Sequence, residues 1–541
     1  MIRTRQKNIP PLFGGCRFST KLDSIRSDEA FIVKNCHIDS RGVAFTRGGS
    51  RAISLEQLDG EITSIYEFTK PVAGGGLQTE TLVTAGYKWY KWDKEPSGAD
   101  NFDVIGAFNT TDKPSLVTFV DGSGVTICIL ANGTDFYKYL GDGVNVTDLL
   151  DSPGDFQSTS LPRYLEVYEN RLAASGCDDN PTNVYMSDLL DPTTWGAAKF
   201  FAVDANRDRS RITGLSVVWS FLVAMKNHAT YIMTEGDPES STVQQIPVSF
   251  TYGTQSHWSI VVWGNKLFFG DENGFYVGVL RQAVDNGLEV TRISDNIDDK
   301  FGEVRKYNQI QGVYVPDTNE IWWSVYPQHS DRYSTILVLN LHLSNFDNPD
   351  RRFVWSGWFE IEGSDAICLG KTVDSNGHVK IWRGDRNGYV YVMEEPAQFK
   401  DEDENGSDED VESKIVLAPF FGPSFIDVKR FRSFAPRLFQ NTNSSTLVSW
   451  VVDQLYKEDG ATIKLEGNIP YFTDGSDSKE PQLWGSTVFA TFPMLPFVID
   501  IERVGRFIIF VISNDGSNAS DRIAYSGATV TYQNLGVRRM A

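Results

Sequence analysis

The residues with the clearest potential for chemistry form an acidic run at 401–412, in which eight of twelve residues are acidic and none is basic. The run matches the calcium-loop pattern D-x-[DN]-x-[DN]-G-x5-E, whose alternating oxygen ligands and turn glycine suit a hard cation. The matching residues are Asp401, Asp403, Asn405, Gly406 and Glu412. However, Asp408 stands where such loops carry an aliphatic residue, and we expect no flanking helices. We interpret the run as a solvated acidic linker, with calcium binding as the alternative.

Catalytic patterns are weak elsewhere. The nearest approach to a sialidase repeat, Thr372–Trp382, has the wrong spacing and does not recur. A glycosidase needs two carboxylates about 5–10 Å apart, which a sequence does not reveal. No HExxH, HxH, GxSxG, P-loop or GxGxxG occurs, and the histidines are isolated. They are His37, His228, His257, His329, His342 and His378. We therefore expect no enzyme activity and assign no catalytic residue, cofactor or metal ligand.

The five cysteines are widely spaced, and no CxxC pair occurs. They are Cys16, Cys36, Cys128, Cys177 and Cys368. An odd number without paired spacing argues against a disulfide framework and against a structural zinc. We expect buried, reduced thiols in a protein made in a cytosol.

The elements that would position any site are short β-hairpins, because long helical periodicity is absent. Each copy has an apolar strand, a turn of Gly, Asn or Asp, and a second strand rich in Tyr, Trp, Val or Ile. The seven copies are Thr81–Asp93, Ile127–Leu140, Arg171–Asp188, Phe221–Met233, Lys266–Leu280, Glu320–Asn340 and Val379–Glu394. Two of them share nearly the same turn, GDENGFYV at Gly270 and GDRNGYVY at Gly384.

The copies start 44 to 59 residues apart, which fits the four-stranded blades of a β-propeller. We therefore predict an all-β chain whose propeller spans residues 61–399 and has about seven or eight blades. The segment Ile53–Phe68 either closes the ring or supplies a further blade. The alternative is a β-sandwich with coincidental hairpin spacing.

Length and charge set broader bounds. The chain has 541 residues, with 71 acidic and 50 basic side chains and a net charge of −21. Such an acidic protein is poorly suited to gripping DNA phosphates, but it could line a passage through which DNA slides. No apolar run approaches the roughly 18–20 residues of a membrane span, so we expect none. The basic start has no apolar stretch behind it, so we expect no secretory signal.

The two ends of the chain differ from the repeats. Residues 1–60 hold ten basic and six acidic side chains, and their NIPPLFGG and TRGGS stretches read as an extended strap. We interpret it as an arm that docks on an acidic neighbouring subunit, with nucleic-acid contact as the alternative. Its basic residues include Arg3, Arg5, Lys7, Arg17 and Lys21. After the predicted acidic linker at 400–412, strands without blade spacing predict a compact antiparallel β domain at 413–541.

Four stretches of the chain carry a family resemblance. They are Gly14–Ser50 (GGCRFSTKLDSIRSDEAFIVKNCHIDSRGVAFTRGGS), Tyr164–Trp195, Arg211–Met233 and Val530–Arg539. In these stretches the sequence resembles the tail nozzle, tail hub or tail tubular proteins of short-tailed bacteriophages. The resemblance implies a propeller with accessory β domains, assembled as a hexameric ring at the end of the tail. Because that family has no catalytic residues, none are carried over.

The resemblance further implies a structural virion protein, made in the host bacterial cytoplasm, that lines and closes the DNA exit channel and opens for genome ejection. Its implied partners are further copies of itself, a tail adaptor or connector ring, and tail fibre or spike proteins. Double-stranded DNA would pass through the lumen without specific binding. The alternative is a carbohydrate-binding or glycosidase-like propeller for host receptor recognition, with an acid- and aromatic-lined pocket on one face.

Overall fold

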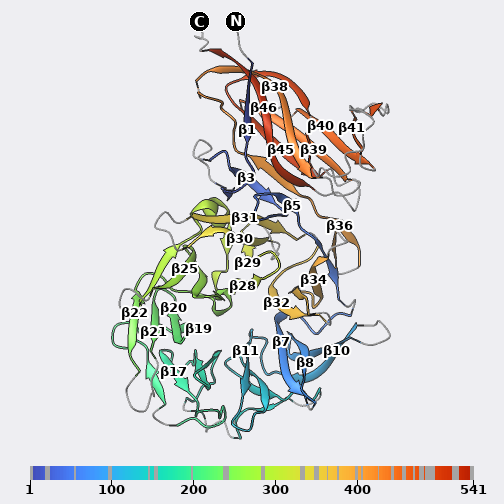
Figure 1. Cartoon of the computed structure of the whole chain (residues 1–541). Coiled ribbons are helices and arrows are strands. Elements are labelled where there is room, and N and C mark those ends of the chain that lie inside the picture. Colours follow the sequence, from blue (N-terminus) through green and yellow to red (C-terminus); the bar gives the residue numbers. More distant parts are fainter. Residues whose placement is uncertain are drawn as a thin grey trace.

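The seven hairpins expected from the sequence are the two middle strands of seven four-stranded blades. In a computed structural model of the chain, the blades surround one axis and a second β domain lies beside the ring (Figure 1). Each blade is antiparallel from its innermost to its outermost strand. The fold is therefore an all-β propeller with an additional antiparallel β domain, as predicted.

The structure describes residues 4–536 apart from 19–24, 54–55, 73, 95–99, 144–145, 152–155, 157, 197–198, 235–242, 282–286, 329–334, 347–351, 362, 375–376, 396–399, 404–405, 425, 440–443, 454–458, 467–468, 474–479, 482–493, 497 and 515–522. Arg3 and Lys21 of the predicted basic arm lie outside this set, as do Glu404 and Asn405 of the acidic run.

The blades follow the chain in order, from innermost to outermost strand. Blade 1 has β7 (Ile62–Val72), β8 (Gly76–Ala85), β9 (Lys88–Lys94) and β10 (Asp100–Ala107). Blade 2 has β11 (Ser115–Val120), β12 (Thr126–Ala131), β13 (Phe136–Tyr139) and β14 (Val146–Asp148). Blade 3 has β15 (Tyr164–Tyr168), β16 (Arg171–Ser175), β17 (Asn183–Met186) and β18 (Phe200–Ala202). Blade 4 has β19 (Ile212–Val218), β20 (Phe221–Lys226), β21 (Thr230–Met233) and β22 (Gln245–Ser249).

Blade 5 has β23 (Val261–Trp263), β24 (Lys266–Asp271), β25 (Gly274–Arg281) and β26 (Gly287–Arg292). Blade 6 has β28 (Gln311–Val315), β29 (Glu320–Pro327), β30 (Thr335–Asn345) and β31 (Arg352–Glu360), with β27 (Val304–Arg305) pairing the end of β29. Blade 7 has β32 (Cys368–Val373), β33 (Val379–Gly384), β34 (Val390–Glu395) and, from the start of the chain, β6 (Gly49–Ala52). Short helical turns η4 (His257–Ser259), η5 (Asp295–Ile297), α1 (Asp298–Phe301) and η6 (Tyr307–Gln309) flank blade 5.

Strand β6 decides the blade count, because it completes blade 7 as its outermost strand. Strand β7 then begins blade 1, so the segment Ile53–Phe68 contributes to an existing blade and supplies no eighth one. Blades 1 and 7 are joined by an apolar cluster that includes Ile62, Trp382 and Val392. Each other pair of neighbouring blades shares a cluster of its own, so the ring is closed by packing on both sides of every blade.

The C-terminal domain is a sandwich of two sheets. The first, the outer sheet, contains β1 (Thr4–Ile9), β46 (Ala524–Gly536), β38 (Val428–Phe439), β44 (Ile499–Gly505) and β43 (Met494–Pro496), with β4 (Cys36–Ile38) and β5 (Ala44–Thr46) at one end. The second contains β37 (Lys414–Leu417), β45 (Ile508–Asn514), β39 (Ser444–Val452), β40 (Asp459–Glu466), β41 (Ile469–Thr473) and β42 (Glu480–Pro481). Phe434 and Phe510 stack between the sheets with ring centroids 3.8 Å apart.

The N-terminal strap is part of both domains, which corrects its prediction as a separate docking arm at residues 1–60. Strand β1 pairs with β46 of the C-terminal domain, and β6 closes the propeller. Between them, β2 (Gly15–Cys16) pairs with β31 of blade 6 and with β3 (Glu29–Lys34), and β3 pairs with both β31 and β37. One continuous sheet therefore runs from blade 6 through the strap into the C-terminal sandwich. The apolar residues of the strap need this burial, so the boundary at residue 60 does not separate independent units.

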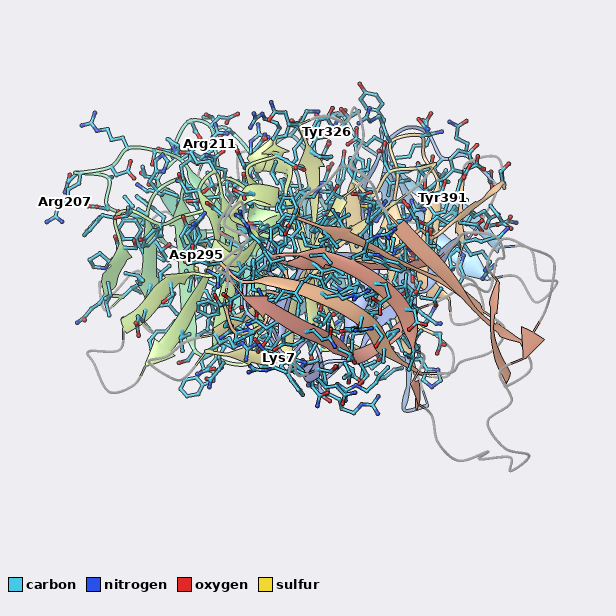
Figure 2. All side chains as sticks on the ribbon, turned by 90° about the horizontal axis from the view of Figure 1, so that it is seen from above. Lys7, Arg207, Arg211, Asp295, Tyr326 and Tyr391 are labelled. Carbon is cyan, nitrogen blue, oxygen red and sulfur yellow. The ribbon has the colours of Figure 1, made fainter. Side chains whose placement is uncertain are left out.

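The propeller has two flat faces, which Figure 2 shows edge-on from the side of the C-terminal domain. Arg207, Arg211 and Tyr326 lie toward one face, where the innermost strands begin, and we name it the start face. Lys7 of β1 lies toward the opposite side. On that side the innermost strands end in turns to the second strands, and we name it the tip face.

Candidate functional site

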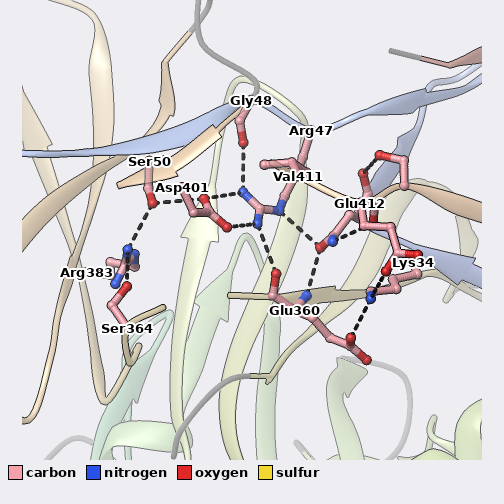
Figure 3. A network of polar contacts seen from close by, with 12 residues as sticks. Lys34, Arg47, Gly48, Ser50, Glu360, Ser364, Arg383, Asp401, Val411 and Glu412 are labelled. Carbon is pink, nitrogen blue, oxygen red and sulfur yellow. Dashed lines mark hydrogen bonds and ion pairs between the residues drawn. The ribbon is translucent and has the colours of Figure 1, made fainter. Parts of the chain in front are cut away.

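The most elaborate polar site lies where the strap meets blades 6 and 7 and the C-terminal domain. We name it the junction network, and Figure 3 shows it from close by. Its members are Lys34, Asn35, Arg47, Ser50, Glu360, Ser364, Arg383, Asp401 and Glu412. They come from segments more than 300 residues apart in sequence, so the network forms only when the domains are joined.

Arg47 and Asp401 form its centre, and both side chains are fully buried. The guanidinium donates through all of its N–H groups: to both oxygens of Asp401, to Asn35 Oδ1, and to the carbonyls of Gly48 and Glu360. Burial would raise the pKa of the Asp401 carboxyl, but Arg47 outweighs it and holds that pKa below its usual range. Both side chains are therefore ionised inside the fold, and every N–H group of Arg47 has an acceptor.

Close backbone approach explains the glycines of the TRGGS stretch. A Cβ at Gly49 would lie 2.0 Å from the carbonyl oxygen of Lys400, so a side chain there would force β6 away from β35 (Lys400–Glu402). Strand β35 pairs with β6 and with β36 (Asp408–Asp410) at the edge of blade 7. The acidic run is thus a strand hairpin, and its prediction as a solvated linker is wrong at Asp401.

Contacts within the junction network argue against calcium binding by the acidic run. The Asp401 carboxylate faces Arg47 and accepts from Ser50 Oγ at 2.9 Å, and Glu412 Oε2 lies 2.9 Å from Lys34 Nζ. Two of the expected calcium ligands therefore face cations of the protein itself. Among the described residues, no group of three His, Cys, Asp or Glu side chains is arranged to hold a metal ion.

Arg383 extends the network into blade 7. Its guanidinium is fully buried and donates to Ser50 Oγ at 2.9 Å, Ser364 Oγ at 2.8 Å and the Asp365 carbonyl at 2.6 Å. It also lies 3.8 Å from the ring centroid of Tyr391, a cation–π contact. Arg383 directly follows Thr372–Trp382, the stretch nearest to a sialidase repeat. This hairpin therefore supplies an arginine that stabilises the fold.

A buried histidine lies beside the network. His37 Nδ1 is 2.8 Å from Glu320 Oε2, and its Nε2 is 3.2 Å from Glu394 Oε2. Burial alone would lower the pKa of His37, but the two carboxylates outweigh it and raise that pKa to about 10. His37 is therefore an imidazolium at neutral pH, held between the strap and blades 6 and 7. In the sequence His37 belongs to no motif, because its carboxylate partners lie more than 280 positions away.

The raised pKa of His37 gives a pH dependence. We expect the free energy of unfolding to fall as pH rises from about 6.5 to about 10, because the folded protein keeps a proton that the unfolded chain releases. The slope of this contribution is at most about 1.4 kcal/mol per pH unit. Urea unfolding at several pH values measures it. His37→Gln should remove this slope, whereas the exposed His378→Gln should keep it, and equal slopes in both variants would contradict the assignment.

A second cluster spans the propeller axis near the start face. Ser115 Oγ of blade 2 lies 3.4 Å from His257 Nε2, which precedes the innermost strand of blade 5. Lys113 Nζ donates to Gln311 of blade 6 and lies 5.0 Å from the ring centroid of Trp258. Because these blades lie on different sides of the ring, the contacts cross its axis. We name these five residues the axial cluster.

Burial affects both ionisable groups of the axial cluster. Burial, aided by Lys113, lowers the pKa of His257 to about 4, so this imidazole is neutral at pH 7. Burial also lowers the pKa of Lys113 to about 8. No carboxylate bonds directly to either group among the contacts that the described residues make. The cluster thus reads as packing across the propeller axis, although Figure 1 shows a gap between the ribbons there.

A groove of about 500 Å³ beside blade 1 is the feature nearest to the pocket that the carbohydrate alternative predicts. Glu56, Asp59, Lys88, Tyr90 and Phe102 line it. The two aromatic side chains are only 5% and 7% exposed, and Lys88 lies 3.3 Å from Asp59. Neither ring therefore presents an open face on which a sugar could stack, and the groove supports no second function.

Other predictions concern single residue types. All five cysteines are free and buried, as predicted. Four tryptophans of the blades, Trp89, Trp322, Trp323 and Trp355, are fully buried. Arg17 of the basic arm lies 3.8 Å from Glu29 of its own strap. Among the described residues, no helix is both long and apolar enough to cross a membrane.

Comparison with known proteins adds little to this picture. No family model and no curated protein matches the sequence. Among solved structures, the N-terminal domain of Nup159 is 10% identical with a TM-score of 0.39, covering 67% of this chain and 97% of its own. The PQQ domain of a pyranose dehydrogenase from Coprinopsis cinerea is 10% identical with a TM-score of 0.32, covering 65% and 97%. Nothing about function is taken from these likenesses.

Proposed function

We propose that this chain is a structural, non-catalytic virion protein of a short-tailed bacteriophage. It would form a hexameric ring at the distal end of the tail, as nozzle or hub, lining and closing the DNA exit channel and opening for ejection. Its partners would be other copies of itself, an adaptor or connector ring, and tail fibres or spikes. Double-stranded DNA would pass through without specific binding, and the protein would be made in the host cytoplasm.

The observation that carries the proposal is the continuous sheet between blade 6, the strap and the C-terminal domain. With the buried Arg47–Asp401 pair beside it, this sheet joins two domains into one body without a flexible linker between blade 6 and the sandwich. A rigid two-domain block suits a ring that must hold pressurised DNA. The family resemblance supplies the assembly for which such a block would serve.

Charge distribution supports the same role. Residues 61–412 carry 53 acidic and 27 basic side chains, whereas residues 1–60 and 413–541 together carry 18 acidic and 23 basic ones. A strongly acidic propeller repels DNA phosphates, which keeps a passage free of sticking. Because contacts of the axial cluster cross the propeller's own axis, the DNA path in the proposed ring would run between copies.

Native mass spectrometry with negative-stain imaging of the purified chain tests the proposal. We expect a ring of about six copies with a central hole, as in the family that the sequence resembles. A monomer at the highest soluble concentration, together with selective binding on a glycan array, would overturn the ring and favour the carbohydrate alternative. A ring without sugar binding would exclude that alternative.

A further inference from the structure

The tip face of the propeller carries an arc of exposed apolar residues over blades 2, 3 and 4. We name it the tip arc, and its members are Val120, Val125, Leu189, Leu190 and Trp219. Leu189 and Trp219 are each 57% exposed. Single exposed apolar residues are ordinary, but a contiguous group of this kind marks an interaction surface.

Backbone contacts show that the arc is contiguous. The Gly122 N–H at the blade 2 tip donates to the Leu190 carbonyl at 2.8 Å. The Leu190 N–H in turn donates to the carbonyl of Asn170 at the blade 3 tip, also at 2.8 Å. The Tyr168 hydroxyl then donates to the Ser220 carbonyl of the blade 4 tip at 3.1 Å. The three blade tips therefore form one surface.

Two of these residues have a backbone conformation that disfavours large side chains. Trp219 has a φ of 58° and Leu190 a φ of 59°, in the left-handed region that turns normally give to glycine or asparagine. Trp219 is the first of two residues in the turn between β19 and β20. In the equivalent turns, the residue at the position of Trp219 is Glu169 in blade 3, with a φ of 49°, and Gly264 in blade 5, with a φ of 58°; Asn170 follows Glu169 and is also left-handed. The fold alone would thus be better served by Asn or Gly at position 219.

Strain in exposed apolar residues points to function, because an unfavourable conformation without a packing reason persists when the side chain is used. The turns around the arc carry the acids Asp121, Glu169, Asp188 and Asp191. Two bases lie among them: Lys199 pairs with Asp188, and Arg171 donates to the Ser187 carbonyl, so four acids stand against two bases. The arc therefore has an apolar centre and an acidic rim, which suits a partner that is apolar and basic.

A surface of that chemistry exists on the chain itself, at one end of the outer sheet of the C-terminal domain. We name it the sheet patch. Ile426, Val504 and Leu535 are 69%, 53% and 43% exposed there. Val504 lies opposite Arg430 in the sheet register, and Arg432 lies two residues further along β38. Both arginines pair with Glu502. The residues next to the patch add Asp427, Arg503 and Arg506, so four bases stand against two acids.

The tip arc and the sheet patch do not meet within one chain. In Figure 1, blades 2 and 3 lie at the end of the ring opposite the C-terminal domain, and blade 4 lies at its side. An interaction between the two surfaces would therefore join different copies head to tail. Such heterologous contacts generate rings when the rotation closes.

We propose that the tip arc of one copy docks on the sheet patch of the next copy, with Trp219 as the central anchor. This inference rests on the proposed ring and names its contact. Trp at the centre of an apolar patch with a charged rim is the usual composition of an interface hot spot. Acidic tips facing arginines set the direction in which copies associate.

The variant Trp219→Asn separates docking from folding. Because asparagine tolerates the left-handed turn, we expect its melting temperature to equal or exceed that of the parent. We expect its self-association, measured by sedimentation, to weaken at least tenfold. Tyr87→Asn is the matched control, since Tyr87 is an exposed aromatic residue (55%) on a blade 1 turn at the start face. It should associate like the parent, and normal association of Trp219→Asn would overturn the proposal.

Cross-linking tests the geometry independently. All native cysteines are buried, so Ser220→Cys and Val504→Cys chains can be co-expressed and treated with a short bis-maleimide. We expect a covalent dimer from this pair and none from Tyr87→Cys with Val504→Cys. Rings that assemble but give no specific dimer would overturn this contact and leave the proposed function standing. A parent chain that stays monomeric would overturn both.

Discussion

A chain that lacks residues 1–52 is expected not to fold. The deletion removes β6, the outermost strand of blade 7, and β3, which links blade 6 to the C-terminal domain. It also removes six buried Ile, Leu or Val side chains: Ile9, Leu12, Ile25, Val33, Ile38 and Val43. Each such side chain contributes about 1.5–3 kcal/mol, whereas whole domains are stable by only about 5–15 kcal/mol.

Circular dichroism and thermal melting of the truncated chain measure this outcome. We expect loss of the cooperative transition, and co-expression of residues 1–60 as a separate peptide should restore part of it. The variant Arg5→Ala/Lys7→Ala is the control, because it changes exposed side chains of β1 and should melt like the parent. A truncated chain that folds normally and loses only its self-association would contradict us and revive the docking-arm interpretation.

Arg47→Ala is expected to lower the free energy of unfolding by about 3–5 kcal/mol, because it leaves the buried Asp401 carboxylate without its main partner. Urea unfolding at pH 7 measures the loss. Arg41→Ala is the control: Arg41 is 72% exposed beside Asp39, and such surface pairs contribute about 0–1 kcal/mol. A loss below about 1 kcal/mol for Arg47→Ala would show that the pair does not hold the junction.

Arg47→Ala should also change how the free energy of unfolding depends on pH. In the parent, Arg47 lowers the pKa of Asp401, so this carboxylate stabilises the fold above its unfolded pKa of about 3.9 and less so as pH falls. Without Arg47, burial favours the protonated acid. The difference in stability between parent and variant should therefore narrow as pH falls toward about 4.

The junction has a consequence for the proposed ring. The shared sheet, the Arg47–Asp401 pair and the His37 site all fix the propeller to the C-terminal domain within one chain. If the ring opens for ejection, copies should move relative to one another while each chain stays intact. The tip arc of one copy and the sheet patch of the next would then be the surfaces that separate.

The amino-acid sequence by itself determined the repeating architecture. Each of the seven predicted hairpins became the middle pair of a blade, and turns such as Asp271–Gly274 and Asp385–Gly388 lie where they were expected. These elements were predictable because a hairpin is local: strand alternation and turn residues stand within some fifteen positions of each other. The free, buried cysteines were predictable from their odd number and wide spacing.

Only the tertiary structure decided how the ends of the chain are used. Strand β6 completes a blade whose other strands begin at Cys368, and Arg47 meets Asp401 across 354 positions. Composition suggested a solvated linker, and among the seven acids of the run that the structure describes, only Asp401 is buried. Likewise, nothing local distinguished Trp219, which is exposed, from Trp322, which is buried. Pairing between distant segments leaves no periodic signal in the sequence, since its energy comes from partners that folding alone brings together.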